Sequence, residues 1–213
     1  MNWIVEILGS SIGKKLLMAL TGLSFLFFLV AHLAGNLTLY GGQDAFTSYA
    51  EHLHALGPLI TVFEVGLLTL AIVHVFTGTI LFLQNRRARA TRYVANARAG
   101  GRTLGSATMP YTGFVILLFV IWHLIQFHFV DKSQTTIWHI VAAAFQNPLY
   151  VTLYMVAMLV VAVHVSHGFW SLFQTLGANH PKYMPAIMVL GLAVSVIFAV
   201  GFGFLPIYVA LTV

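Results

Sequence analysis

Five long apolar segments constrain the fold of this chain more than any other feature of its sequence. They cover about residues 16–40, 59–83, 109–130, 148–177 and 183–209, and a helix needs roughly 20 residues to cross a bilayer. The chain is 60% hydrophobic and 7% charged, whereas average proteins contain about 25% charged residues. The sequence therefore predicts an all-α integral membrane protein. We expect residues 1–213 to form one domain, with the first four spans in an up-down bundle.

Two shorter segments have the pattern of helices that lie at a membrane surface. Residues 2–13 and 133–146 place apolar side chains at helical spacing. Trp138 is expected to anchor the second of them, because tryptophan favours the membrane interface. Residues 41–58 are expected to form a polar loop.

Basic residues lie almost entirely at one end of the predicted bundle. The N-terminal side contains Lys14, Lys15, Lys182 and six arginines within residues 85–108, whereas the opposite side contains Lys132. Positively charged loops are retained in the cytoplasm. We therefore expect a multi-pass protein of the bacterial cytoplasmic membrane, with its N-terminus inside and its C-terminus outside. The net charge of +5 is attributed to topology and not to nucleic-acid binding.

One histidine lies deep in each of the first four apolar segments. An ionisable side chain in hydrocarbon is costly, so such residues are candidates for a functional site. At ~1.5 Å per residue, His32 and His123 lie ~12 Å from the outer edge, while His74 and His164 lie ~18–20 Å from the inner edge. Spans 1 and 3 are diagonal in an up-down bundle, as are spans 2 and 4. The sequence thus predicts an outer pair, His32–His123, and an inner pair, His74–His164.

Two layers of two histidines favour two stacked haem b groups with bis-histidine iron ligation. Cysteine is absent, which excludes iron–sulfur clusters, thiolate-bound haem and covalently attached c-type haem. Zinc or copper would need three or four ligands in one small sphere. Gly78 and Gly168 lie one helical turn after the inner-layer histidines and would leave a hollow beside each imidazole. His167 is the rival ligand on span 4 and could instead bond a haem propionate.

Other polar residues are candidates for cofactor or quinone contacts. Arg86 and Arg87 follow span 2 on its inner side, where they could pair with haem propionates as well as fix topology. Glu64 lies ~9 Å inside the outer edge, where a carboxylate could relay protons to a quinone. A helix-end acid that reaches the interface is the competing interpretation. Weaker candidates for the same quinone site are Glu51, Asn36 and Tyr49.

Several motifs occur together between Ser10 and about Tyr183: SSIGKKLLMALTG, FLVAHLAGNL, YAEHLHALGP, two His-x-x-x-Gly helices, HGFWSLFQTLG and NHPKY. In combination they resemble the di-haem cytochrome b membrane anchor of succinate:quinone oxidoreductases, in its one-chain, five-helix form. The resemblance implies that one histidine from each of the first four helices ligates haem, and these correspond to His32, His74, His123 and His164.

The resemblance also implies partners and a pathway for electrons. A flavoprotein with covalent FAD and an iron–sulfur subunit would bind on the cytoplasmic side. Electrons would pass through the haems between the iron–sulfur subunit and a membrane quinone, menaquinone in this branch of the family. The complex would act as succinate dehydrogenase or fumarate reductase, and the chain would hold no dicarboxylate site of its own. Assembly of this three-subunit unit into a higher oligomer is left open.

Two alternatives stay open. A di-haem cytochrome b subunit of a hydrogenase or formate dehydrogenase would use the same ligands, but the YAEHLH and HGFWSLFQTLG stretches argue against it. A proton-coupled transporter would use the histidines as a relay. It would also need a column of polar groups across the membrane, which the inner halves of spans 1 and 3 do not show.

Overall fold

The structure, a computed structural model, describes residues 3–88 and 103–213 as helices and short connections, with no strand in that part of the chain. In chain order the elements are α1 (Trp3–Gly9), α2 (Ser11–Asn36), the 3-10 segment η1 (Leu37–Gly41), α3 (Gly42–His54), α4 (Pro58–Arg87), α5 (Leu104–His123), the π-helical segment η2 (Leu124–His128), α6 (Ile137–Phe145), α7 (Pro148–Thr175) and α8 (Met184–Thr212). Four of the arginines in the basic segment, Arg89, Arg92, Arg98 and Arg102, lie outside the described residues.

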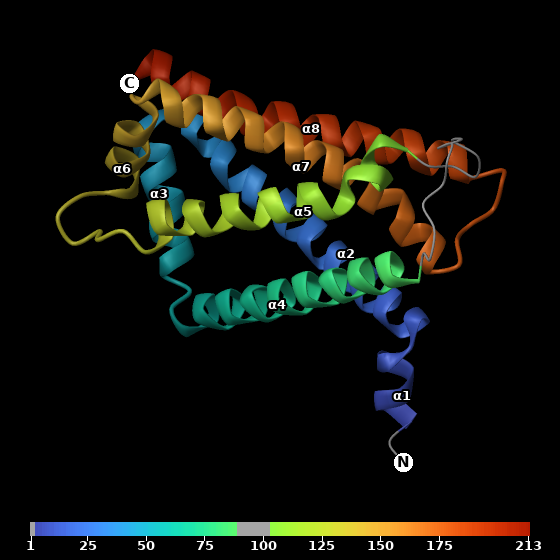
Figure 1. Cartoon of the computed structure of the whole chain (residues 1–213). Helices are drawn as coiled ribbons and strands as arrows, with labels where there is room; N and C mark the ends of the chain where they lie inside the picture. The colour runs from blue at the N-terminus through green and yellow to red at the C-terminus, as the bar shows by residue number, and fades with distance from the viewer. Residues whose placement is uncertain (1–2, 89–102) are drawn as a thin grey trace.

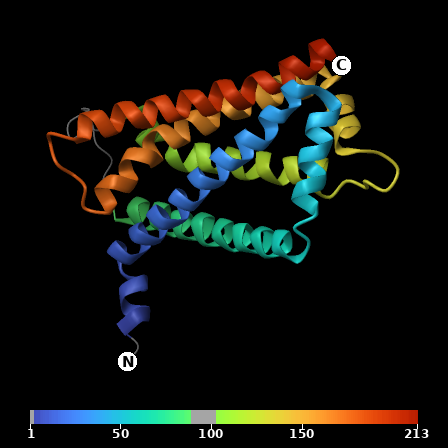
Figure 2. The ribbon, with the colours of Figure 1, turned by 180° about the vertical axis from the view of Figure 1, so that it is seen from behind.

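Five of these helical stretches are long and apolar enough to cross a membrane, and they contain α2, α4, α5, α7 and α8. This confirms the predicted all-α membrane architecture. In Figures 1 and 2, α5, α7 and α8 run side by side, α4 lies at the opposite edge from α8, and α2 crosses the stack obliquely. Because α2 contacts α4, α7 and α8, it connects the two edges.

Helix α8 lies against α7 along its length and covers the bundle from one side. Glycines allow this close approach: a Cβ added at Gly191 would lie 2.9 Å from Cδ1 of Phe169 on α7, and one at Gly201 would lie 2.9 Å from Cδ2 of Leu33 on α2. Between these contacts, Phe198 is only 2% exposed. The fifth span therefore packs outside the four helices that carry the predicted ligands.

The segment after the first span is helical, so the expectation of a polar loop over 41–58 is wrong. The α2 helix ends at Asn36, η1 continues to Gly41, and α3 follows. Gly42 adopts φ +82°, a left-handed conformation that glycine accepts without strain. The chain therefore turns sharply there and brings α3 against α6.

This contact also corrects the role expected for Trp138. Its ring is 8% exposed, and it lies 6.4 Å from the ring of Phe46 on α3. Both residues belong to one apolar cluster with Leu39 and Phe145. Trp138 is thus a core residue of the short helices and not an interfacial anchor, because α3 supplies it with an apolar protein partner.

The remaining boundaries differ from the expected ones by a few residues. The interfacial segment 2–13 is divided, since α1 ends at Gly9 and α2 begins at Ser11, where the Ser10 side chain caps the backbone N–H of Gly13 at 3.0 Å. Lys14 and Lys15 therefore lie inside α2. The short α1 runs across the direction of the long helices (Figures 1 and 2).

Candidate functional site

The inner layer consists of His74 on α4 and His164 on α7, and a threonine from a neighbouring helix bonds each imidazole. Thr21 Oγ1 on α2 lies 2.8 Å from His74 Nδ1. Thr112 Oγ1 on α5 lies 3.1 Å from His164 Nδ1. The Nδ1 atom of each of these two imidazoles therefore has a hydroxyl partner on a neighbouring helix.

The outer layer consists of His32 on α2 and His123 at the end of α5. Their ring centroids are 6.0 Å apart, and their planes are nearly perpendicular at 87°. The phenol oxygen of Tyr154 on α7 lies 3.1 Å from His123 Nδ1 and donates to Gln126 Oε1 at 2.9 Å. A buried hydroxyl therefore engages this histidine as well.

His32 has a different environment from the other three histidines. Its ring stacks on Phe28 at 5.2 Å and lies 5.6 Å from Phe202 of α8. Asn36 Nδ2 donates to the His32 carbonyl oxygen at 2.8 Å and lies 3.5 Å from its Nδ1. The outer layer is thus asymmetric, because a phenol bonds one imidazole while mainly aromatic rings hold the other.

The spacing of the two layers follows from the helices that supply them. On both α2 and α5, the threonine of the inner layer precedes the histidine of the outer layer by 11 residues. At the α-helical rise this separation corresponds to roughly 16 Å along the axis.

The residues present fit bis-histidine ligation of a metal. Bonds between a metal and imidazole nitrogen are about 2.0–2.1 Å long, so two imidazoles on opposite sides of one metal have ring centres roughly 6 Å apart. The outer pair has this spacing, at 6.0 Å. Within the described ranges, no group of three or more histidine or acidic side chains converges on one point, so each layer offers two ligands.

Gly78 and Gly168 contact the helices that carry the threonines. A Cβ at Gly78 would lie 3.4 Å from the Met18 methyl carbon on α2, and one at Gly168 would lie 3.6 Å from the Met109 methyl carbon on α5. A flexible thioether side chain therefore lies against each glycine where the sequence predicted a hollow, and such a side chain can adapt to a bound group.

The other inner candidates lie between the inner layer and the basic end. The Nδ1 atom of His167 is buried and has no hydrogen-bond partner among the described residues. Its ring packs edge-on against Trp170 at 4.7 Å. Arg86 and Arg87 are exposed in the last turn of α4. Nearby, Lys14 Nζ on α2 donates to Gln84 Oε1 at 3.1 Å.

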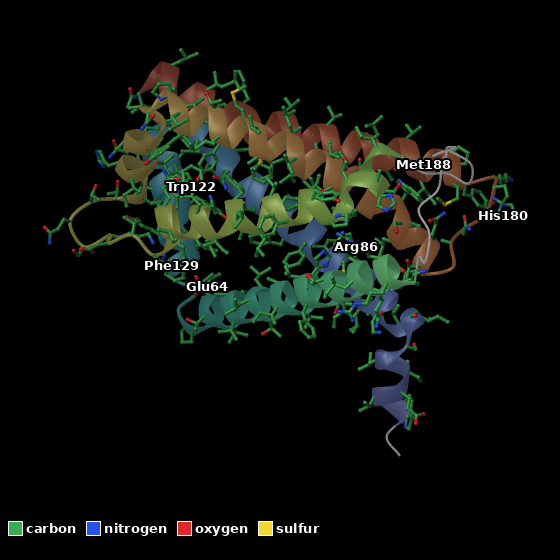
Figure 3. The ribbon with its side chains drawn as sticks, viewed as in Figure 1. Glu64, Arg86, Trp122, Phe129, His180 and Met188 are labelled. Atoms are coloured by element: carbon green, nitrogen blue, oxygen red, sulfur yellow. The ribbon has the colours of Figure 1, made fainter. Side chains whose placement is uncertain are left out.

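Glu64 lies at the opposite end of α4 from Arg86 (Figure 3). Its Oε1 is 3.7 Å from Nδ1 of His128 in η2, and the two side chains are 47% and 43% exposed. Lys132 Nζ donates to the His128 carbonyl oxygen at 2.7 Å. Glu64 therefore has an imidazole partner that the sequence analysis missed. Of the weaker quinone-site candidates, Tyr49 packs its phenol against Gly35, Asn36 lies next to His32, and Glu51 is exposed.

Thr21, Thr112 and Tyr154 were also missed, although a repeat in the sequence could have revealed the two threonines. The pattern M-x-x-T-G occurs at 18–22 and again 91 residues later at 109–113, and H-x-x-x-G occurs at 74–78 and again 90 residues later at 164–168. A Cβ at Gly22 would lie 3.8 Å from His74 Cε1, and one at Gly113 would lie 3.4 Å from His164 Cε1. The α2–α4 and α5–α7 halves therefore repeat the same contacts, and each half contributes one histidine to each layer.

Comparison with known proteins identifies a protein of similar sequence. The chain is 26% identical over 153 residues to the succinate dehydrogenase cytochrome b558 subunit of Bacillus subtilis (strain 168). The aligned region covers 70% of this chain and 72% of that protein. The chain is thus similar to a cytochrome b subunit of succinate dehydrogenase. No family model and no solved structure gives a significant match. This similarity and the five apolar helices support a multi-pass membrane protein.

Proposed function

We propose that this chain is the membrane-anchor cytochrome b subunit of a succinate:quinone oxidoreductase. Two haem b groups would carry electrons between a cytoplasmic iron–sulfur subunit and a membrane quinone. The observation that carries the proposal is the arrangement of four histidines in two layers, with one ligand from each half of the chain in each layer. The similarity to a succinate dehydrogenase cytochrome b558 subunit supports the choice of enzyme.

In this proposal His74 and His164 hold the inner haem, and His32 and His123 hold the outer haem. Haem, when bound, supplies a one-electron couple whose potential depends on its axial ligands and their hydrogen bonds. The protein fixes the imidazoles on four rigid helices and surrounds them with apolar and hydroxyl-bearing side chains. Because the layers are roughly 16 Å apart along the helices, the two haems would be successive electron-transfer sites across the membrane.

The inner layer faces the end of the bundle that would bind the catalytic partners. Lys14, Lys15, Arg86 and Arg87 lie at this end, in the first turns of α2 and the last turn of α4. The positive-inside rule places such residues in the cytoplasm, so the N-terminus would be inside and the C-terminus outside. A basic surface there suits docking of the iron–sulfur subunit, which would connect to a flavoprotein that carries FAD.

The Glu64–His128 pair lies at the outer end and suits proton exchange with a quinone, which by the resemblance would be menaquinone. Quinone chemistry moves protons together with electrons, and a carboxylate or an imidazole can act as the proton donor or acceptor. The pair is half-exposed at the surface of the bundle. His128 follows the outer ligand His123 by five residues within one continuous helical stretch. Protons and electrons would thus meet at the same end of the bundle.

The hydrogenase or formate dehydrogenase alternative differs in its partner and not in its haem ligands. A proton-coupled transporter is disfavoured because the hydroxyls that bond the histidines form local clusters, one at each layer. Thr21 and Thr112 serve the inner pair, and Tyr154 serves the outer pair.

A pyridine haemochrome assay and a redox titration on the tagged complex, purified from its native membrane, test the proposal. We expect two haem b groups per chain with low-spin spectra, together with a flavoprotein and an iron–sulfur protein. Succinate should reduce the haems in that complex. A chain without haem would overturn the proposal, and co-purification with a hydrogenase or formate dehydrogenase in place of a succinate-oxidising flavoprotein would replace it with the alternative.

A further inference from the structure

We propose that Thr21, Thr112 and Tyr154 are positioning residues that fix the tautomer of three of the four histidines. Each hydroxyl would hold the proton on Nδ1 and leave the Nε2 lone pair free for iron. The inference rests on the proposed haem-binding function and adds to it the groups that orient and tune the ligands.

Counting the protons of the two threonine hydroxyls assigns the inner-layer tautomers. A threonine hydroxyl has one proton to donate and two lone pairs that accept. Thr21 Oγ1 donates to the Leu17 carbonyl oxygen at 2.7 Å, so toward His74 it can only accept. The single proton of Thr112 Oγ1 has two carbonyl acceptors within reach, Thr108 at 3.2 Å and Met109 at 3.1 Å. With these protons committed to the carbonyl oxygens, both inner-layer imidazoles carry their proton on Nδ1 in the proposed arrangement.

The same count applies to Tyr154 in the outer layer. Its phenol donates to Gln126 Oε1 at 2.9 Å, with the amide oxygen of that side chain turned toward it. The phenol proton is then committed, and the oxygen accepts from Nδ1 of His123 at 3.1 Å. Tyr154 is 6% exposed, so water does not compete strongly for this bond. His123 is held in the same tautomer as the inner pair.

The recurrence of the contact in both halves supports a role in ligation over incidental packing. Two separate segments of sequence, 91 residues apart, supply the same M-x-x-T-G pattern. In each, the threonine bonds the histidine and the adjacent glycine faces Cε1 of the same imidazole. Metal-bound histidines characteristically donate their second ring N–H to a neighbouring acceptor, which fixes ring orientation and raises ligand basicity.

His32 is the one histidine of the four to which the proposal does not apply, because no hydroxyl bonds its Nδ1 among the described residues. Asn36 Nδ2 is a donor, and it lies 3.5 Å from His32 Nδ1, at the limit of a hydrogen bond. No threonine or tyrosine hydroxyl bonds this imidazole within the described residues. We therefore assign hydroxyl tuning to both inner ligands but to only one outer ligand.

The test is a redox titration of the purified complex that carries Thr21→Val, Thr112→Val or Tyr154→Phe. Each change removes the hydroxyl and preserves most of the side-chain volume. Loss of an acceptor makes the imidazole a poorer electron donor, so ferric iron is less stabilised and the midpoint potential of that haem rises. A three- to tenfold loss of ferric preference corresponds to an increase of about 28–59 mV for a one-electron couple.

The pattern of shifts decides the outcome. We expect both threonine variants to raise the potential of one haem, and Tyr154→Phe to raise that of the other, with two haems retained. Thr21→Ser and Thr112→Ser should restore the parent values because serine keeps the hydroxyl. Thr79→Val is the matched control, since the Thr79 hydroxyl bonds only the Val75 carbonyl oxygen among the described residues.

Unchanged potentials, equal shifts at both haems or a shift in Thr79→Val would overturn the inference while the haem proposal stands. If a valine variant loses its haem, the haem content of the matching serine variant decides the outcome. Loss of haem in both variants would show that the threonine acts by packing and would overturn the inference. Retention of haem in the serine variant alone would support it. A parent chain that contains no haem would instead overturn the proposed function.

Discussion

Glu64 and Tyr154 occupy equivalent positions in the two halves of the chain, each ten residues before an inner-layer histidine. Tyr154 is buried, and its phenol bonds His123 of the outer layer at 3.1 Å. Glu64 is half-exposed and pairs with His128 at 3.7 Å. One half therefore uses this position to bond a buried histidine, while the other places a half-exposed ionisable pair there. The two halves are alike at the inner layer and differ at the outer end.

The two-layer arrangement predicts which histidine variants should lose the same haem. His74→Ala and His164→Ala should each lose the inner haem, because removal of either axial ligand opens the same site. His32→Ala and His123→Ala should lose the outer haem. Haemochrome content and redox-titrated spectra measure this, with His167→Ala as a control that keeps both haems. Loss of the same spectral component in His32→Ala and His74→Ala would contradict the pairing.

Glu64→Gln should slow quinone turnover by about tenfold or more, because general acid–base groups typically contribute factors of 10²–10⁴. The amide preserves the shape of the side chain but cannot carry a proton. Both haems should remain bound and should still be reduced by succinate. The measurement is steady-state quinone reduction by the complex, with Glu6→Gln on the distant α1 as a control. Unchanged turnover would return Glu64 to the role of a helix-end acid.

Trp138→Ala should destabilise the protein by about 3–5 kcal/mol, the usual cost of truncating a buried aromatic residue. The effect arises because Trp138 fills the cluster between α3 and α6 and is 8% exposed. Trp3→Ala is the matched control, since Trp3 is 66% exposed. Thermal unfolding in detergent compares the two variants, and equal melting temperatures would show that Trp138 is an interfacial residue after all.

Two glycine-to-alanine changes should have opposite effects on stability. A Cβ at Gly191 would lie 2.9 Å from Cδ1 and 3.2 Å from Cβ of Phe169, so α7 and α8 would have to move apart. Overpacking of this kind costs about 1–3 kcal/mol. At Gly66 nothing lies within 4 Å of an added Cβ, and alanine should stabilise the helix by about 0.5–1 kcal/mol. Thermal unfolding of both variants in one detergent gives the comparison, and a gain in stability at Gly191 would contradict the tight α7–α8 contact.

The sequence could predict the five spans because hydrocarbon admits few alternatives to an apolar helix. Helical rise also predicted the relative depths of His32, His74, His123 and His164, since depth along a straight helix depends on residue count alone. These two properties need no knowledge of which helix faces which.

Contacts between helices were harder to predict. Trp138 has the amphipathic character of an interfacial residue, and only the packing of α3 against α6 makes it a core residue. Thr21 and Thr112 look like ordinary polar residues of membrane helices, and their role depends on helix rotation. The repeated M-x-x-T-G pattern was the signal available, but it acquires meaning only when the imidazoles are placed beside it. The pairing of Glu64 with His128 likewise depends on the π-helical end of the third span.

The division of each histidine pair between the two halves has a consequence for biogenesis. A ribosome delivers α2 and α4 to the membrane before α5 and α7, so the emerging first half holds one member of each pair and completes neither. The outer pair is complete only once α5 has inserted, and the inner pair only once α7 has inserted. A prosthetic group at the outer site would then have to await α5, and one at the inner site would have to await α7. A product that terminates before α5 would present two unfilled sites to membrane quality control.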